Sequence, residues 1–166
     1  MPADRLTLEE RARLGSLAAL VDCERVRLYR SATGGVSGLF RGIVLGLSCH
    51  RAVALGNHVF LPDRCERDLP VLAHELIHCS QYQAWGPLLY FGRGFVAQVR
   101  DLLYRLGRIG TSPYRYDVEP GKPFSEYGME QQGQIVEDCF RGHPPAQAIS
   151  PFWPGGPAEP QATPSA

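Results

Sequence analysis

Apolar side chains recur three or four positions apart in four parts of the chain, which is the spacing of one face of an α-helix. The four segments are residues 7 to 21, about 68 to 84, 88 to 106 and about 125 to 142. Thr7 and Glu10, at the start of the first, have the spacing of a capping box. Asp68 is a suitable N-cap for the second, and Trp85-Gly86-Pro87 ends it. The pattern therefore predicts four helices.

Shorter stretches have the pattern of strands. Alternation of apolar and polar residues predicts a strand at 26 to 29, and residues 52 to 61 indicate a hairpin or a bent strand with Gly56-Asn57 at the bend. The glycines between residues 34 and 38 predict a loop, and the apolar run from 43 to 47 a strand or a buried turn. The expected fold class is α+β, with short antiparallel strands packed on helices.

One domain accounts for the length. The chain has 166 residues and enough apolar content for one core, and we expect the domain to span residues 1–142. Residues 143–166 are rich in proline, glycine and alanine and are expected to form a disordered tail. Phe152 and Trp153 are the exceptions, because they could dock on the body or on a partner. Residues 111 to 124 are expected to be a loop.

The second predicted helix carries a His-Glu-x-x-His motif at His74, Glu75 and His78. Residues four apart lie on the same helix face, so the two imidazoles can bind one metal ion. Glu75 lies about 100° further round and is placed to reach a water molecule on that metal. In metallopeptidases this arrangement binds zinc, with the glutamate as general base. The alternative is a coincidental pair of structural histidines.

A catalytic zinc needs a third protein ligand. On the fourth predicted helix, one stripe carries Glu126, Glu130, Gln134 and Glu137. Glu130 is the preferred ligand, Glu137 is the first alternative and Glu126 another. Gln134, one turn beyond Glu130, is expected to hydrogen-bond a ligand imidazole. The simpler interpretation of the stripe is the polar face of a surface helix.

Further side chains are candidates for contacts with the ligands or with a substrate. His58 could line the cleft, although an ordinary strand histidine is the simpler interpretation. Tyr82 and Tyr127 are candidates of the same kind. In the 111 to 124 loop, Tyr114 or Tyr116 could donate a phenol hydrogen bond to a developing oxyanion, with aromatic packing as the favoured alternative.

Charge narrows the partners. Lysine plus arginine and aspartate plus glutamate number 17 each, so the net charge is zero, and the arginines are scattered along the chain. Composition therefore argues against nucleic acid and against an anionic membrane surface as partners. No apolar run has the length of a membrane span, and the N-terminal residues lack the apolar core of a signal peptide.

The cysteines are odd in number and form no Cys-x-x-Cys pair. They are Cys23, Cys49, Cys65, Cys79 and Cys139. We expect them to be mostly reduced, and buried, in a cytoplasmic protein. Cys79 follows a motif histidine directly, but it points about 100° away from His78, so it is not a favoured metal ligand.

Four stretches together resemble a bacterial zincin-like family. They are Ala54-Leu55-Gly56-Asn57-His58-Val59-Phe60, Ala73-His74-Glu75-Leu76-Ile77-His78, Gln81-Tyr82-Gln83 and Glu130-Gln131-Gln132-Gly133-Gln134-Ile135-Val136-Glu137-Asp138. The family includes the metallopeptidase domain linked to extracellular contractile injection systems and the proteins labelled "vgr-related". The resemblance covers about residues 50 to 142 and rests on the combination of motifs more than on the first alone.

This resemblance implies a small zincin-like domain with a gluzincin-type site. Zinc would lie on His74, His78 and a downstream glutamate on a second ligand-bearing helix, with Glu75 as base. The chain departs from the family pattern after the second histidine, where it has Cys79-Ser80. It also has Gln134 where many members carry an acidic residue.

The leading hypothesis is zinc-dependent peptide hydrolysis. One rival is a non-catalytic, zinc-stabilised module of a bacterial secretion or injection apparatus. Another is a metal hydrolase that cleaves a non-peptide amide, such as a cell-wall bond. Without a signal peptide, the expected location is the cytoplasm, with delivery by a non-classical secretion system as the route outward.

Overall fold

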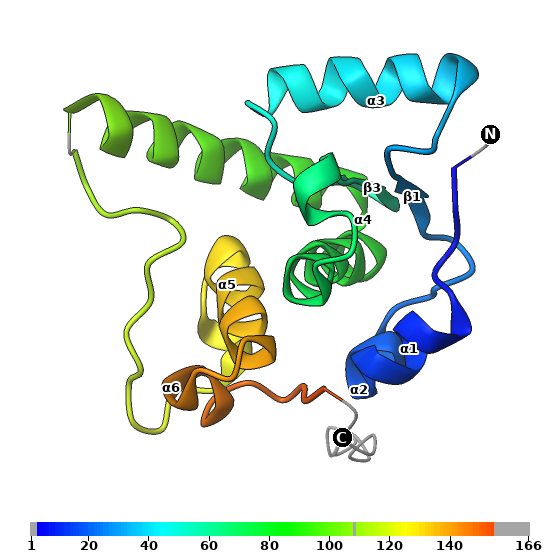
Figure 1. Cartoon of the computed structure of the whole chain (residues 1–166). Coiled ribbons are helices and arrows are strands. Elements are labelled where there is room, and N and C mark those ends of the chain that lie inside the picture. Colours follow the sequence, from blue (N-terminus) through cyan, green and yellow to red (C-terminus); the bar gives the residue numbers. More distant parts are fainter. Residues whose placement is uncertain (1–2, 108, 155–166) are drawn as a thin grey trace.

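The computed structural model describes residues 3 to 107 and 109 to 154 (Figure 1). In chain order its elements are α1 Leu8–Leu14, α2 Ser16–Leu20, β1 Arg27–Tyr29, α3 Gly35–Leu47, β2 Val53–Leu55, β3 His58–Phe60, the 3-10 turn η1 Asp63–Cys65, α4 Leu69–Gly107, the 3-10 turn η2 Phe124–Glu126, α5 Met129–Phe140 and α6 Pro144–Gln147. Helices pack around a three-stranded sheet, which confirms the α+β class.

The helix α4 lies at the centre of the molecule (Figure 1) and contacts α1, α2, α5, β2 and β3. The Val71 N–H donates to Asp68 Oδ1 at 3.3 Å, which confirms Asp68 as the N-cap. The helix breaks at Gly86, whose φ is 75° and ψ 171°. Pro87 disfavours a helical conformation in the residue before it, and glycine adopts the positive φ at low cost.

The break divides α4 into two parts, which we call the first arm (69 to 85) and the second arm (87 to 107). They correspond to the second and third predicted helices. The first arm is largely buried, whereas the second extends away from the body (Figure 1). The Tyr90 hydroxyl donates to the Ala54 carbonyl at 2.8 Å and ties the second arm to the edge strand β2.

The sheet has β3 between β1 and β2. Its hairpin turns at Gly56, whose φ of 65° favours glycine, and the predicted strand and hairpin are confirmed. Of the two strand pairs in the described sheet, however, β2–β3 is antiparallel and β1–β3 is parallel. The expectation of antiparallel strands throughout was therefore wrong, since α3 returns the chain before the hairpin begins.

The N-terminal segment forms two short helices where one was expected over residues 7 to 21. Gly15 has φ 57° and ψ −128°, which no helix interior allows, and it separates α1 from α2. The capping box is confirmed, because the Glu10 N–H donates to Thr7 Oγ1 at 3.1 Å and the Thr7 N–H to Glu10 Oε2 at 2.9 Å.

The α3 helix replaces the loop expected at 34 to 38 and the strand or turn expected at 43 to 47. Glycine is a weak helix former, and four glycines in this segment concealed the helix. Tertiary contacts hold it instead. The Arg41 guanidinium donates to the Leu61 carbonyl at 2.6 Å and pairs with Asp63 at 2.6 Å.

The C-terminal segment is ordered further than expected. Residues 144 to 147 form α6, and Phe152 is only 9% exposed, packed edge-on against Phe124 with ring centroids 5.7 Å apart. The disordered tail expected from residue 143 is therefore wrong for residues 143 to 154. Of the two aromatic residues that could dock, Phe152 packs on the body, whereas Trp153 is exposed. Residues 155 to 166 lie outside the described part of the chain.

The α5 helix is also shorter than predicted, because η2 and a turn precede it.

The larger of two core clusters in the described residues joins α4 to the sheet and to the N-terminal helices. Leu14, Leu28, Val59, Leu76 and Ile77 are almost completely buried in it. All five cysteines are free thiols, and three of them are buried. Within the described residues, no helix combines the length and apolar character needed to cross a bilayer.

Replacing Phe152 with alanine is expected to lower the free energy of unfolding by about 3–5 kcal/mol, because it removes a buried ring and leaves a cavity. Trp153→Ala is the matched control. Its side chain is 43% exposed, so its loss should cost less than about 1 kcal/mol. Equilibrium denaturation in urea measures both values, and equal effects would contradict the docking of Phe152.

Candidate metal centre

The motif histidines lie one turn apart on the first arm of α4, with ring centroids 5.0 Å apart. Across from them, α5 presents Glu130, whose Oε2 lies 3.4 Å from His78 Nε2 and 3.9 Å from His74 Nε2. All three side chains are buried, and their ligand atoms lie within 4.8 Å of one another. The structure therefore brings together the three residues that the sequence nominated, in a group that could hold a metal ion.

The other ring nitrogen of each histidine meets an acceptor. Glu137 Oε2 lies 3.1 Å from His74 Nδ1, and Gln81 Oε1 lies 2.9 Å from His78 Nδ1. An Nδ1–H that donates to these oxygens leaves the lone pair on Nε2, which faces Glu130. When the rings are neutral, these contacts favour the tautomer and orientation that metal binding requires.

The acceptors are themselves fixed. Arg141 pairs with Glu137 at 2.9 Å and with Asp68 at 3.1 Å. The Gln81 amide nitrogen donates to Gln132 Oε1 at 2.9 Å, and the Gln132 amide nitrogen donates to the Tyr127 carbonyl at 2.9 Å. These bonds set which end of the Gln81 amide faces His78.

The contacts also show how α5 lies against α4. From the start of α5 to its end, Gln132 meets Gln81, Glu137 meets His74, and Arg141 just beyond meets Asp68. The two helices are therefore antiparallel, and their register places Glu130 opposite both histidines.

A glycine makes this close approach feasible. A Cβ on Gly133 would lie 2.8 Å from His74 Nε2, closer than a real side chain can come. Gly133 lies in the middle of α5, where glycine normally costs helix stability. Its position is explained by the space that the His74 imidazole needs.

The charges of the group are strongly coupled. Burial works to lower the pKa of His78, but the facing Glu130 carboxylate and the hydrogen bonds to the ring raise that pKa to about 9. Burial works to raise the pKa of Glu130, yet the His78 and His74 rings bring it below its usual value. Without metal, His78 is therefore protonated and paired with a carboxylate.

A cavity of about 860 Å³ opens on the three donors. It is walled by the end of α3, by β2, by both arms of α4, by α5 and by Tyr114 of the loop. Glu75 lines it and is only 5% exposed, and burial raises the pKa of this carboxyl. Among the described residues, no hydrogen-bond donor meets the Glu75 carboxylate. A buried carboxylate without a hydrogen-bond donor is stabilised when a ligand or a solvent molecule lies beside it and donates to it.

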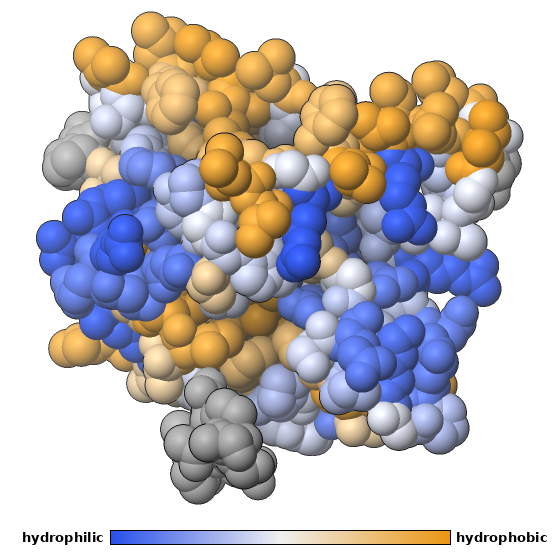
Figure 2. Space-filling model, turned by 180° about the vertical axis from the view of Figure 1, so that it is seen from behind, coloured by the Kyte–Doolittle hydropathy of each residue, from blue (hydrophilic) through white to orange (hydrophobic). Residues whose placement is uncertain are grey.

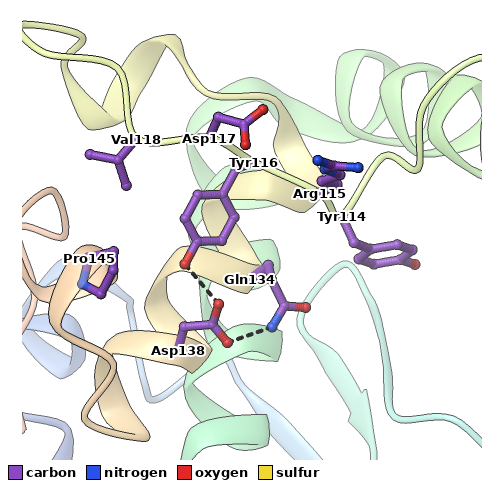
Figure 3. Close-up of a pocket in the computed structure, with 8 residues that line it drawn as sticks. All are labelled: Tyr114, Arg115, Tyr116, Asp117, Val118, Gln134, Asp138 and Pro145. Atoms are coloured by element: carbon purple, nitrogen blue, oxygen red, sulfur yellow. Dashed lines mark hydrogen bonds between the residues drawn. The ribbon is translucent and has the colours of Figure 1, made fainter.

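Gln134 does not bond an imidazole as expected. Its amide nitrogen donates to Asp138 Oδ1 at 2.9 Å, and the Tyr116 hydroxyl donates to the other oxygen of Asp138 at 2.7 Å (Figure 3). These contacts hold Gln134 beside a second hollow of about 530 Å³, where Tyr114 points away from the other labelled side chains. Glu137, two turns beyond Glu130, takes the role expected of Gln134.

The remaining candidates lie outside the cavity. The His58 Nδ1 lies 3.0 Å from the Tyr29 hydroxyl, and the Tyr82 ring lies against Gly56 in the hairpin turn. Tyr127 is 3% exposed and its hydroxyl donates to the Asp117 carbonyl, so it supports the centre only through its own carbonyl. None of the three is placed to contact a metal or a substrate in this cavity.

The alternative ligands separate clearly. Glu137 lies near the centre but bonds the far nitrogen of His74, and Glu126 is exposed in η2. Cys79 is fully buried away from the cavity, and burial raises the pKa of its thiol. Glu130 is therefore the carboxylate that joins the two histidines.

Two contributors were missed by sequence reasoning. Gln81 lies three residues after His78 on the same helix face, a spacing that could have indicated contact. Arg51 lines the cavity with its guanidinium 4.9 Å from the Tyr114 ring centroid, and no local pattern marks it.

Comparison with known proteins gives one partial similarity to report. Over 67 residues the chain is 40% identical to the type VI secretion system spike protein VgrG2b of Pseudomonas aeruginosa. The match covers 40% of this chain but only 6% of that protein's length. No family model matches the chain, and no solved structure matches it.

Zinc content tests the ligand set directly. Purified wild type is expected to carry about one zinc per chain, and Glu130→Ala is expected to lose most of it, because the site is left with two histidines. Gln134→Ala is the matched control on the same helix and should retain zinc. Equal zinc in wild type and Glu130→Ala, measured by elemental analysis, would exclude Glu130 as a ligand.

Metal binding is also expected to release about one proton at pH 7, since His78, with a pKa of about 9, must become neutral to bind metal. Affinity should therefore rise with pH until about 9 and then level off. Calorimetric titration in buffers of different ionisation enthalpy counts the proton. Binding at pH 7 with no proton release would contradict the ion pair.

Proposed function

We propose that the chain is a zinc-dependent peptide hydrolase domain in which His74, His78 and Glu130 hold the metal. The observation that carries the proposal is Glu75. This buried carboxylate lines the same cavity as the three donors and meets no hydrogen-bond donor among the described residues. In metal hydrolases, a carboxylate so placed beside two histidines and a glutamate is the general base.

The donor set fits zinc. Two imidazole nitrogens and one carboxylate oxygen are the ligands of catalytic zinc sites, and they leave a fourth position open. Gly133 leaves room for the His74 ring, and Glu137 and Gln81 orient the two imidazoles. When bound, zinc would lower the pKa of a water molecule and polarise the scissile carbonyl.

The protein's own residues would move the proton. Glu75 takes a proton from the attacking water as the water oxygen bonds to the carbonyl carbon. It then gives that proton to the amine nitrogen as the carbon–nitrogen bond breaks. Burial, which raises the pKa of Glu75, suits a carboxylate that must hold a proton between the two steps.

Tyr114 and Arg51 would stabilise the oxygen that becomes negative. Both line the cavity, and the Tyr114 ring lies 6.5 Å from that of His74. Burial and the nearby Glu130 raise the pKa of Tyr114 to about 12, so its phenol keeps its proton and can donate a hydrogen bond. This supports the catalytic alternative for Tyr114 over simple aromatic packing.

A second function is favoured by a separate observation. The similarity to a secretion-system spike protein supports a module delivered by, or assembled with, such an apparatus. In a non-catalytic module of this kind, the metal would serve to hold α4 and α5 together. The two functions differ in what metal removal does.

The Glu75→Gln variant tests the catalytic proposal. It should keep its zinc, because Glu75 is not a ligand, and should lose about 10²–10⁴-fold in turnover of an unstructured protein substrate. Glu126→Gln is the control, since Glu126 is exposed and outside the cavity. A zinc-loaded Glu75→Gln protein with wild-type turnover would refute the mechanism.

Chelation separates the alternatives in the same assay. An enzyme should lose activity while circular dichroism shows that most of its helix content survives. A zinc-stabilised module should unfold as the metal leaves. Turnover of peptidoglycan fragments but not of protein would assign the site to a non-peptide amide instead.

A further inference from the structure

Two helices present large apolar side chains that the described chain does not cover. Twenty such side chains are exposed in the described residues, and α3 contributes five of them and the second arm of α4 nine. Val36 is 86% exposed, Leu47 83%, Leu88 89% and Leu106 78%. This is far more than the scattered apolar exposure of ordinary surfaces.

The two helices lie at the same end of the molecule. Figure 1 places α3 and the second arm of α4 along the top, and Figure 2 shows apolar surface gathered along that edge from behind. They also form the mouth of the metal cavity, where Leu47 of α3 and Phe95 of the second arm both line the wall. We call this surface the apolar end.

The charge of the apolar end is positive. Of the four arginines on its two helices, Arg41 is paired with Asp63 and Arg105 with Asp101, the one acidic residue of these helices. The other two, Arg93 and Arg100, form no ion pair within the described residues. Asp101 is 7% exposed and pairs with Arg105 at 2.8 Å, so neither helix shows an exposed carboxylate. The expectation from net charge alone missed this separation.

We propose that the apolar end docks on the surface of an anionic lipid bilayer, with both helices lying in the interface. An apolar helix face flanked by arginines is the pattern of interfacial helices. Where the second arm begins, the Arg93 guanidinium carbon lies 4.3 Å from the centroid of the Trp85 ring. Tryptophan side chains favour the headgroup region of a bilayer. Each arginine near an anionic surface adds attraction, and no exposed carboxylate on either helix opposes it.

Charge also argues against a second copy as the occupant. A symmetric dimer through this surface would bring two net positive faces together. On a bilayer, the same positive charge is attractive. Docking in this way would turn the mouth of the metal cavity toward the lipid, independently of whether the centre is catalytic.

Co-sedimentation with vesicles tests the proposal. Wild type should bind phosphatidylcholine vesicles that contain phosphatidylglycerol, and salt should weaken the binding. The double variant Leu39→Glu with Leu106→Glu should bind about tenfold more weakly or worse, because two exposed leucines lose their apolar contact. Arg100→Glu should weaken binding to the anionic vesicles but leave residual binding to pure phosphatidylcholine unchanged.

Matched controls come from α1, which lies away from the apolar end (Figure 1). Leu8 is 84% exposed and the Arg13 side chain 57%, so Leu8→Glu and Arg13→Glu should bind as wild type does. Unchanged circular dichroism and zinc content show that each variant is folded. Glu75→Gln should also bind vesicles normally, which separates this proposal from the hydrolytic one.

Several results would overturn the proposal. One is a failure of the wild type to bind anionic vesicles. Another is binding of the Leu39→Glu, Leu106→Glu protein that equals binding of the wild type. The wild type could instead be a dimer in light scattering, with the double variant a monomer and neither protein bound to vesicles. That result would assign the surface to a second copy of the chain. Binding of polyglutamate but not of vesicles, through the same residues, would assign it to an acidic polypeptide.

Discussion

Burial of several ionisable groups in one small space is the constraint on which the rest of the structure depends. His74, His78, Glu75 and Glu130 are all less than 8% exposed at the junction of α4 and α5. Buried charges are costly unless each is paired or bound to a metal. The protein meets this cost with an ion pair between His78 and Glu130 and with Glu137 on the outer nitrogen of His74. The Glu75 carboxylate is left without such a partner among the described residues, and it faces the cavity on which the three donors open.

Local sequence rules predicted the part of the site that lies on one helix. The four-residue spacing of His74 and His78 follows from helix geometry, and Asp68 and Gly86 mark where that helix begins and breaks. The part of the site that depends on how α5 packs against α4 was predicted for one contact and missed for the next. Glu130 was found because a stripe of carboxylates on a later helix is visible in sequence. Whether the next contact falls on residue 134 or 137 depends on the antiparallel register, which no local pattern contains.

Glycine accounts for another part of the difference between sequence and structure. A glycine normally indicates a loop or a weak helix, and the α3 prediction failed for that reason. In α3 the compensation is tertiary, since Arg41 donates to the carbonyls of Tyr29 and Leu61, which lie in two different segments. In α5, Gly133 lowers the helix propensity, but its lack of a Cβ leaves space for the His74 imidazole. In both helices the contact that explains the glycine lies far away in sequence, so it cannot be inferred from the neighbouring residues.

Average charge is misleading for a related reason. Net charge sums over the whole surface, whereas a partner meets only one face of it, and here a neutral chain keeps its exposed carboxylates off two apolar helices. The apolar end adjoins the candidate metal centre because both lie on α4. That helix carries the two histidines before the break at Gly86 and the exposed apolar side chains after it. Tyr90 then fixes the second arm on β2 beside the cavity. A partner that docked on the apolar end would therefore also limit what can reach the three donors of the cavity.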